Sequence, residues 1–163
     1  MKTVFLYILV LIGFQSFAQK TLDEVLKTHN HSDVLYMSVQ ELAMPKTKAK
    51  ILDARSIEEY NVSHLKDAVF VDYNKFSLKK TTQLLPDKNE LIVVYCSIGL
   101  RSAKIAQQLK DEGYTNVFNL YGGIFEWKNN NFLVFDLNGQ KTEKVHVYNK
   151  YWSKWLIKGE KVF

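Results

Sequence analysis

The sequence has little cysteine, no long hydrophobic run and no strong excess of one charge. Its single cysteine, Cys96, excludes a disulfide framework within the chain. The 22 basic residues are scattered among 17 acidic ones, so the formal charge of +5 is typical of a solvated surface and not of a nucleic-acid-binding face. No internal repeat or low-complexity tract occurs. The 163 residues, 47% of them hydrophobic, suffice for one folded domain and exclude wholesale disorder.

The N-terminal residues are typical of an export signal. Lys2 precedes an uncharged, mostly aliphatic run over 4–14, and the small residues Ser16 and Ala18 follow in a small-x-small pattern. Spanning a bilayer takes roughly 20 apolar residues, so this run is too short for a permanent membrane helix. We therefore expect residues 1–18 to be a signal peptide and the mature protein to be periplasmic or secreted. An uncleaved signal, which would anchor the protein to a membrane, stays open as an alternative.

Helix and strand patterns alternate along the rest of the chain. A Ser or Thr followed three residues later by Glu predicts helix starts at Thr21, Ser38 and Ser56. Short aliphatic runs predict strands at 34–37, 51–52, 69–71, 91–95 and 117–120, and apolar periodicity predicts a helix over 101–112 that ends at Gly113. Because the run 91–95 shows no polar alternation, the fold class is predicted to be α/β, with a parallel sheet covered by helices on both faces.

Three parts follow the signal: a lead-in helix over 19–33, a main domain over 34–131 and a C-terminal extension over 132–163. In the extension, Asn138-Gly139 predicts a hairpin turn between 132–137 and 145–148. Aromatic residues then recur at helical spacing, at Tyr148, Tyr151, Trp152 and Trp155. They predict either a short helix packed on the main domain or, since lysines flank the rings, a docking surface over 148–158 for a partner protein or a membrane.

The residues most suited to chemistry run from Cys96 to Ser102. Cys96 ends the most hydrophobic predicted strand, and parallel sheets bind ligands beyond the carboxyl ends of their strands. Gly99 allows a sharp turn into the next helix, which directs backbone N–H groups and the helix dipole toward the sulfur. Together with the charge of Arg101, these groups predict a pKa of Cys96 below the free-thiol value of about 8.5. An inert core cysteine is the alternative, which the polar residues after Cys96 disfavour.

Five segments in order resemble a single-domain rhodanese, a sulfurtransferase. They are 51–55, 58–60, 64–68, the Cys96-x-x-Gly99-x-Arg101-Ser102 loop and 121–127. The resemblance implies five parallel strands and a Cys96 persulfide, which takes sulfur from thiosulfate or a related small-molecule donor and passes it to a thiol or cyanide acceptor. It also implies catalytic roles for Cys96 and Arg101 and neither a metal nor an organic cofactor. The substrate-binding residues would be the rest of the loop, namely Ser97, Ile98, Gly99, Leu100 and Ser102.

The family usually reads Gly-His-Ile-x-Gly-Ala around His64, whereas this chain has Ser63-His64-Leu65-Lys66-Asp67-Ala68, and the loop after Cys96 also departs from the family pattern. Asp67 stands where glycine is usual, and we expect the turn to survive because Asp tolerates a left-handed conformation. Ser97 stands where relatives often carry Arg, so one cationic group for an anionic donor is missing.

Other residues near these motifs are expected to be structural. We predict that Asp53 and Arg55 form part of the scaffold, with Arg55 paired to Glu58 or Glu59. His64 is predicted to order its loop, since no acid or second ligand nearby suggests a metal site.

Other functions are alternatives to sulfur transfer. Phosphatases of related fold place five residues between Cys and Arg, whereas four separate Cys96 from Arg101, and an arsenate reductase would need a second thiol. A non-enzymatic module stays open: a persulfide carrier, a redox sensor or a partner-binding domain, because an exported thiolate without a second cysteine is prone to overoxidation.

Overall fold

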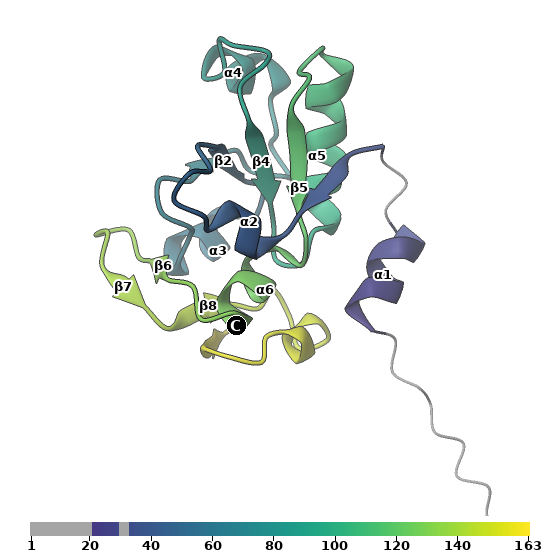
Figure 1. Ribbon diagram of the computed structural model, residues 1–163. Coiled ribbons are helices and arrows are strands. Elements are labelled where there is room, and N and C mark those ends of the chain that lie inside the picture. Colours follow the sequence, from purple (N-terminus) through teal and green to yellow (C-terminus); the bar gives the residue numbers. More distant parts are fainter. Residues whose placement is uncertain (1–20, 30–32) are drawn as a thin grey trace, which may run out of the picture.

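The computed structural model describes residues 21–29 and 33–163, and the predicted signal peptide lies outside them (Figure 1). As predicted, five parallel strands form one sheet, and their order in it is β1-β5-β4-β2-β3. The strands are β1 (Leu35–Met37), β2 (Lys50–Asp53), β3 (Val69–Phe70), β4 (Ile92–Tyr95) and β5 (Val117–Leu120). The helices are α1 (Leu22–His29), α2 (Val39–Leu42), α3 (Ile57–Val62), α4 (Leu78–Gln83), α5 (Leu100–Asp111) and α6 (Gly123–Asn129).

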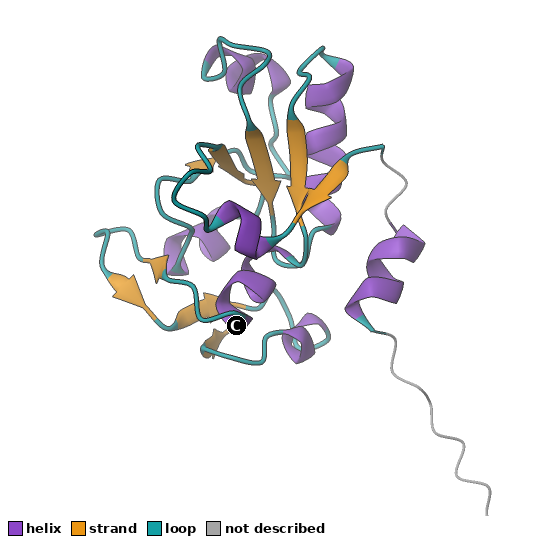
Figure 2. Cartoon of the chain, viewed as in Figure 1, coloured by secondary structure: helices purple, strands orange, loops and turns teal. Residues whose placement is uncertain are grey.

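Helices cover both faces of the sheet (Figure 2). All four residues of β4 are buried, and their side chains alternate between two core clusters. Val93 and Tyr95 belong to the cluster that includes α2 and α6, whereas Ile92 and Val94 belong to the one that includes α5. Burial on both faces explains why this segment is continuously hydrophobic.

The predicted helix starts form as expected. At Ser56 the capping box is complete, with the side chains of Ser56 and Glu59 each bonded to the backbone of the other residue. Thr21 and Glu24 make the same reciprocal pair, and Ser38 accepts from the N–H of Glu41. The departure from the family pattern is tolerated as predicted, since Asp67 adopts φ 58°.

The extension adds two small sheets and one helical turn. Strands β6 (Val134–Phe135) and β7 (Lys141–Thr142) pair antiparallel around the predicted Asn138-Gly139 turn, and β8 (Lys144–His146) pairs parallel with β9 (Glu160–Val162). The prediction that residues 145–148 form the second arm of the hairpin was wrong. Val145 is fully buried in the core, and the polar residues Lys141–Thr142 form the second arm of the hairpin in its place.

The predicted aromatic helix is reduced to one 3₁₀ turn, η1 (Trp152–Trp155). Tyr148 adopts φ 64°, a left-handed value that takes it out of any helix, and the side-chain oxygen of Asn149 accepts from the N–H groups of Tyr151 and Trp152. The two tryptophans of this turn pack against the core of the main domain.

None of the helices in the described parts of the chain combines the length and the apolar character that a bilayer crossing requires.

Candidate active site

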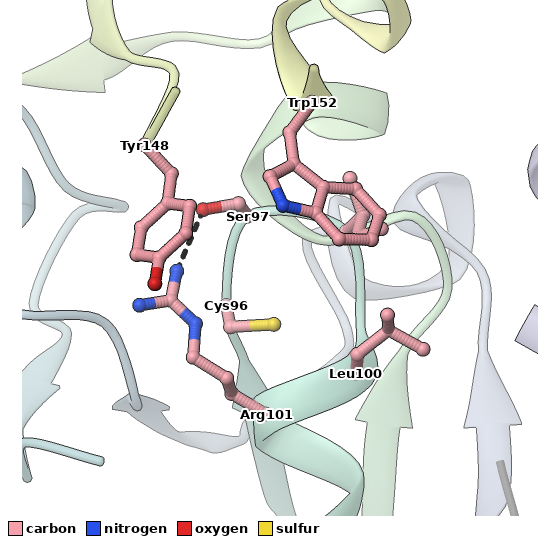
Figure 3. A pocket seen from close by; sticks show the side chains of 7 residues that line it. Cys96, Ser97, Leu100, Arg101, Tyr148 and Trp152 are labelled. Atoms are coloured by element: carbon pink, nitrogen blue, oxygen red, sulfur yellow. Dashed lines mark hydrogen bonds between the residues drawn. The ribbon is translucent and has the colours of Figure 1, made fainter. Parts of the chain in front are cut away.

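Cys96 lies directly after β4, and the following turn wraps around its sulfur. Gly99 adopts φ 106° before α5, and its N–H donates to Cys96 Sγ at 3.1 Å. The Ser102 hydroxyl lies 3.4 Å from the same sulfur. Cys96 is only 1% exposed, yet it lines a pocket instead of facing packed hydrocarbon alone (Figure 3). The strand-to-helix geometry inferred from the sequence therefore forms.

The Ser102 hydroxyl has one proton and two acceptors within reach. Asn119 Oδ1 lies 2.7 Å from it, and Cys96 Sγ lies on its other side. The Asn119 amide in turn donates to the Gly99 carbonyl at 2.8 Å, so this residue of β5 holds the backbone of the turn after Cys96. Because a thiolate is a better hydrogen-bond acceptor than a thiol, the Ser102 hydroxyl could rotate slightly and donate its proton to the ionised sulfur.

The N-terminus of α6 holds the backbone of the same loop. The N–H of Ile124 donates to the Cys96 carbonyl at 2.9 Å, and the N–H of Phe125 donates to the Ser97 carbonyl at 3.1 Å. These donors are among those that a helix start leaves without a partner inside the helix. A Cβ at Gly123 would overlap the Cys96 carbonyl oxygen, so this close approach requires glycine.

Arg101 is held by Glu59 in a two-pronged ion pair. Its two terminal nitrogens lie 2.6 and 2.7 Å from the two Glu59 oxygens, and one of them also donates to Ser97 Oγ at 2.9 Å. Ser97 Oγ donates to Glu59 at 2.8 Å and closes the network. Burial opposes ionisation of Glu59, but the hydrogen bonds and charge of Arg101 outweigh it and hold its pKa at about 2. The pair is therefore ionised at neutral pH.

The surroundings of Cys96 favour its thiolate. Burial opposes the charge, but the positive charge of Arg101 and the hydrogen bonds from Ser102 and Gly99 outweigh it, so the pKa of Cys96 lies below its ordinary value. This direction agrees with the expectation from the sequence. The arrangement favours the nucleophilic, ionised form of the sulfur.

A pocket with a volume of about 220 Å³ opens above the sulfur. Its walls come from the loop after β4 and from the extension (Figure 3). They comprise Cys96, Ser97, Ile98, Leu100, Arg101, Tyr148 and Trp152.

All seven residues singled out from the sequence thus meet at one place. Ser97, Ile98 and Leu100 line the pocket beside Cys96 and Arg101, whereas Gly99 and Ser102 lie under the sulfur and hydrogen-bond to it.

Sequence reasoning missed four contributors to the site. Glu59 was predicted to cap its helix and to be one possible partner of Arg55, so its pairing with Arg101 was not anticipated. Asn119 carried no local signal. Tyr148 and Trp152 had been noted in the aromatic pattern, but only as part of a packing or docking face.

The prediction that Arg55 pairs with Glu58 or Glu59 was wrong, because Arg55 binds Asp53. Both side chains are fully buried, with a nitrogen–oxygen distance of 2.7 Å, and the Tyr95 hydroxyl donates to the same carboxylate. Arg55 also donates to the Ser63 carbonyl at 2.6 Å. The pair connects β2, β4 and the loop after α3, which agrees with the predicted scaffold role.

His64 orders its loop. Its ring stacks on Tyr60 at 4.2 Å, and its backbone exchanges two hydrogen bonds with Phe135 of β6. Among the residues that the structure describes, no three His, Cys, Asp or Glu side chains are grouped so as to hold a metal ion.

Comparison with known proteins adds a family and a set of relatives. A family model described as Rhodanese-like domain matches residues 38–130. The tRNA uridine(34) hydroxylase of Aster yellows witches'-broom phytoplasma (strain AYWB) is 37% identical over 99 residues, which cover 56% of this chain and 32% of that protein. The protein of the same name from Enterobacter sp. (strain 638) is 30% identical over 106 residues, 61% of this chain and 30% of that one. The match therefore spans about a third of these relatives.

Solved structures show the same fold. The crystal structure of thiosulfate sulfurtransferase from Pseudomonas aeruginosa has a TM-score of 0.59 at 23% identity and covers 71% of this chain and 22% of that one. The BH2092 protein from Bacillus halodurans has a TM-score of 0.56 at 23% identity, with 72% and 85% covered. At such identities the likeness concerns the fold alone.

Proposed function

The chain belongs to the family of rhodanese-like domains, and we propose that it is a sulfurtransferase that carries a sulfane sulfur on Cys96 as a persulfide. The observation that carries this proposal is the position of Cys96, whose sulfur accepts from the Gly99 N–H and lies beside the Ser102 hydroxyl and within the field of Arg101. These groups stabilise a negative charge on the attacking sulfur and, after transfer, on the persulfide.

In the first step, the thiolate of Cys96 attacks the outer sulfur of thiosulfate or a related sulfane donor. A new S–S bond forms to Cys96 Sγ, and the S–S bond within the donor breaks. The bonding electron pair leaves on the remainder of the donor, which is sulfite when thiosulfate is used. Dividing the transfer into two such displacements is covalent catalysis.

In the second step, a thiolate or cyanide attacks the outer sulfur of the persulfide. The S–S bond to Cys96 breaks, its electron pair returns to Sγ, and the acceptor leaves with the extra sulfur. The Ser102 hydroxyl, shared between Sγ and Asn119 Oδ1, is placed to donate to the returning charge.

Export to a periplasm or secretion is part of the proposal and depends on the expected signal at residues 1–18. The small-molecule donor and the thiol acceptor would then meet Cys96 outside the cytoplasm. A second thiol of the chain could not resolve the persulfide, because Cys96 is the single cysteine in the sequence.

The name of the relatives suggests another candidate, hydroxylation of uridine in tRNA. The match covers about a third of those proteins, so most of each of them has no counterpart in the matched segment. Sulfur transfer is favoured because its two steps use groups that already surround Cys96. A non-enzymatic carrier, sensor or partner-binding module remains the alternative from the same site.

The test is mass spectrometry of the purified protein after incubation with thiosulfate or inorganic polysulfide, together with thiosulfate:cyanide turnover. We expect one added sulfur atom on Cys96 and turnover that is lost in Cys96→Ser. A folded protein that gains no sulfur from either donor would refute the proposal. A gain of sulfur without turnover to cyanide or any thiol would favour the carrier, and partner capture that persists in Cys96→Ser would favour the module.

A further inference from the structure

The pocket above Cys96 has mostly apolar walls. Ile98 and Leu100 come from the loop, and Tyr148 and Trp152 come from the extension (Figure 3). At about 220 Å³ the pocket is smaller than the 300–1,000 Å³ range typical of sites for drug-sized ligands. It therefore suits a small molecule with an apolar group.

The positive charge at this pocket is already compensated. Among its lining residues Arg101 is the basic one, and both of its terminal nitrogens bind the buried Glu59 carboxylate. The Tyr148 ring covers the guanidinium, with 4.9 Å between its centroid and Arg101 Cζ (Figure 3). The pair is neutral as a whole, so the pocket offers no uncompensated positive charge to an anionic substituent of the acceptor. Such a substituent would have to compete with Glu59 for Arg101.

Contacts within the extension hold the two aromatic walls in place. The N–H of Tyr148 donates to His146 Nδ1 at 3.0 Å, and the Trp152 ring packs on Trp155 at 5.2 Å and on Tyr151 at 5.0 Å. Tyr148 and Trp152 both lie beyond residue 130, outside the segment that the family model matches. Residues of the extension thus both supply these two walls and hold them in place.

From the apolar walls and the compensated arginine, we infer that the physiological acceptor is a small thiol with an uncharged, apolar substituent, and that Tyr148 and Trp152 select it. This inference rests on the proposed sulfurtransferase function. The substituent packs between the two rings while the acceptor's thiolate attacks the outer persulfide sulfur. The acceptor's thiol proton goes to solvent, the S–S bond to Cys96 breaks with its electron pair returning to Sγ, and the acceptor leaves as a persulfide.

The experiment compares two primary thiols that share an ethyl spacer. Full-length protein is loaded with sulfur from thiosulfate or inorganic polysulfide, desalted, and mixed with 2-phenylethanethiol or 2-mercaptoethanesulfonate at equal thiolate concentrations. Loss of the added sulfur is followed by mass spectrometry. We expect the phenyl thiol to discharge Cys96 at least about tenfold faster, the discrimination that a small apolar group typically gains in a fitted pocket.

Variants assign this preference to the extension. Tyr148→Ala and Trp152→Ala should each reduce the ratio of the two rates several-fold, whereas Ile157→Ala, an exposed apolar residue of the same extension, should leave it unchanged. Tyr148 is 53% exposed, so its truncation tests the inference even if Trp152→Ala fails to fold.

Equal rates for the two thiols, or a ratio that is unchanged in folded Tyr148→Ala, would overturn the inference while leaving sulfur transfer intact. Failure of the protein to load sulfur at all would overturn the proposed function at the first step, before any acceptor is compared.

Discussion

Arg101 acts on Cys96 through its charge while its hydrogen bonds go to Glu59 and Ser97. The Arg101 guanidinium lowers the pKa of Cys96, although burial opposes this effect, and Glu59 fixes the position of the guanidinium. Its role is therefore electrostatic and geometric, and each part can be measured separately.

Replacing Arg101 with alanine should raise the pKa of Cys96 and slow sulfur transfer by about a hundredfold, the cost typical of removing one charge-stabilising group from an active site. The pKa is measured as the midpoint of iodoacetamide alkylation against pH, which we expect below the free-thiol value of about 8.5 in the unmodified protein. Lys104→Ala, which removes an exposed cation from the same helix, should change neither quantity. A wild-type midpoint at or above the free-thiol value would contradict this account of the loop.

Glu59 should make the fold sensitive to acid. Its pKa is lowered from 4.5 to about 2, so the stability that its ionised form contributes is fully present above pH 4.5 and is lost as pH falls toward 2. A shift of this size corresponds to about 3 kcal/mol.

Urea denaturation across this pH range tests the contribution of Glu59. Glu59→Gln should be less stable than wild type at pH 7 and should lack the loss that wild type shows between pH 4.5 and 2. Glu41→Gln, at the corresponding capping position of α2 where the carboxylate is exposed, should follow the wild-type profile. An identical acid loss in Glu59→Gln would assign the effect to other carboxyl groups.

At the scale of elements, the loop that begins at Cys96 is held by hydrogen bonds at the N-termini of two helices, α5 and α6. The N–H of Gly99, the residue before α5, donates to the sulfur, whereas the N–H groups of Ile124 and Phe125 in α6 donate to the carbonyl oxygens of Cys96 and Ser97. Both helices begin after a glycine in a left-handed conformation, Gly99 and Gly122. The chain thus uses the unpaired donors of two helices to shape one turn.

Gly123→Ala should therefore displace the loop. A Cβ at this position would overlap the Cys96 carbonyl oxygen and would lie 2.8 Å from the Ser97 carbonyl carbon, in addition to the strain of φ 55°. We expect a loss of stability of about 2 kcal/mol or more and a marked fall in the alkylation rate of Cys96.

Gly139→Ala provides the matched control for this substitution. It carries a similar strain at φ 72° but meets nothing within 4 Å, so it should show a smaller loss of stability and unchanged alkylation. Equal effects of the two substitutions would mean that backbone strain, and not contact with the loop, is responsible.

At the scale of the whole molecule, the extension completes the core on one face of the sheet. Val134, Val145, Val147 and Leu156 are fully buried in the same cluster as residues of β4 and α6. Because the extension also supplies two walls of the pocket, its folding and the shape of the active site are linked.

Leu156→Ala should reduce the free energy of unfolding by about 2–5 kcal/mol, as expected for truncating a buried leucine. Its neighbour Ile157 is 80% exposed, and Ile157→Ala should change stability by no more than about 0.5 kcal/mol. Two of the three tryptophans lie in the extension, so tryptophan fluorescence reports mainly on that part of the chain. In wild type, fluorescence and far-UV circular dichroism should show one coincident unfolding transition in urea. Separate transitions would show that the extension unfolds on its own.

The five strands, the capped helices and the position of Cys96 between a strand and a helix could be predicted because each depends on residues close together in the chain. Strand β4 is marked by its continuous hydrophobicity, the helix starts by their capping residues, and the turn after Cys96 by Gly99 and Arg101. The hairpin turn at Asn138-Gly139 was recognised for the same reason. The second arm of the hairpin was not predicted, because Val145 packs in the core and does not pair with the first arm.

The sequence by itself determined the order of the elements and the place of the proposed nucleophile Cys96 at the end of a strand, since periodicity and turn chemistry are local properties. Only the tertiary structure decided which carboxylate holds Arg101 and which rings border the pocket. Glu59 lies 42 positions before Arg101, and Tyr148 and Trp152 come from a different end of the chain. Such contacts are set by how the sheet, α3 and the extension pack together, and no pattern of neighbouring residues encodes that packing.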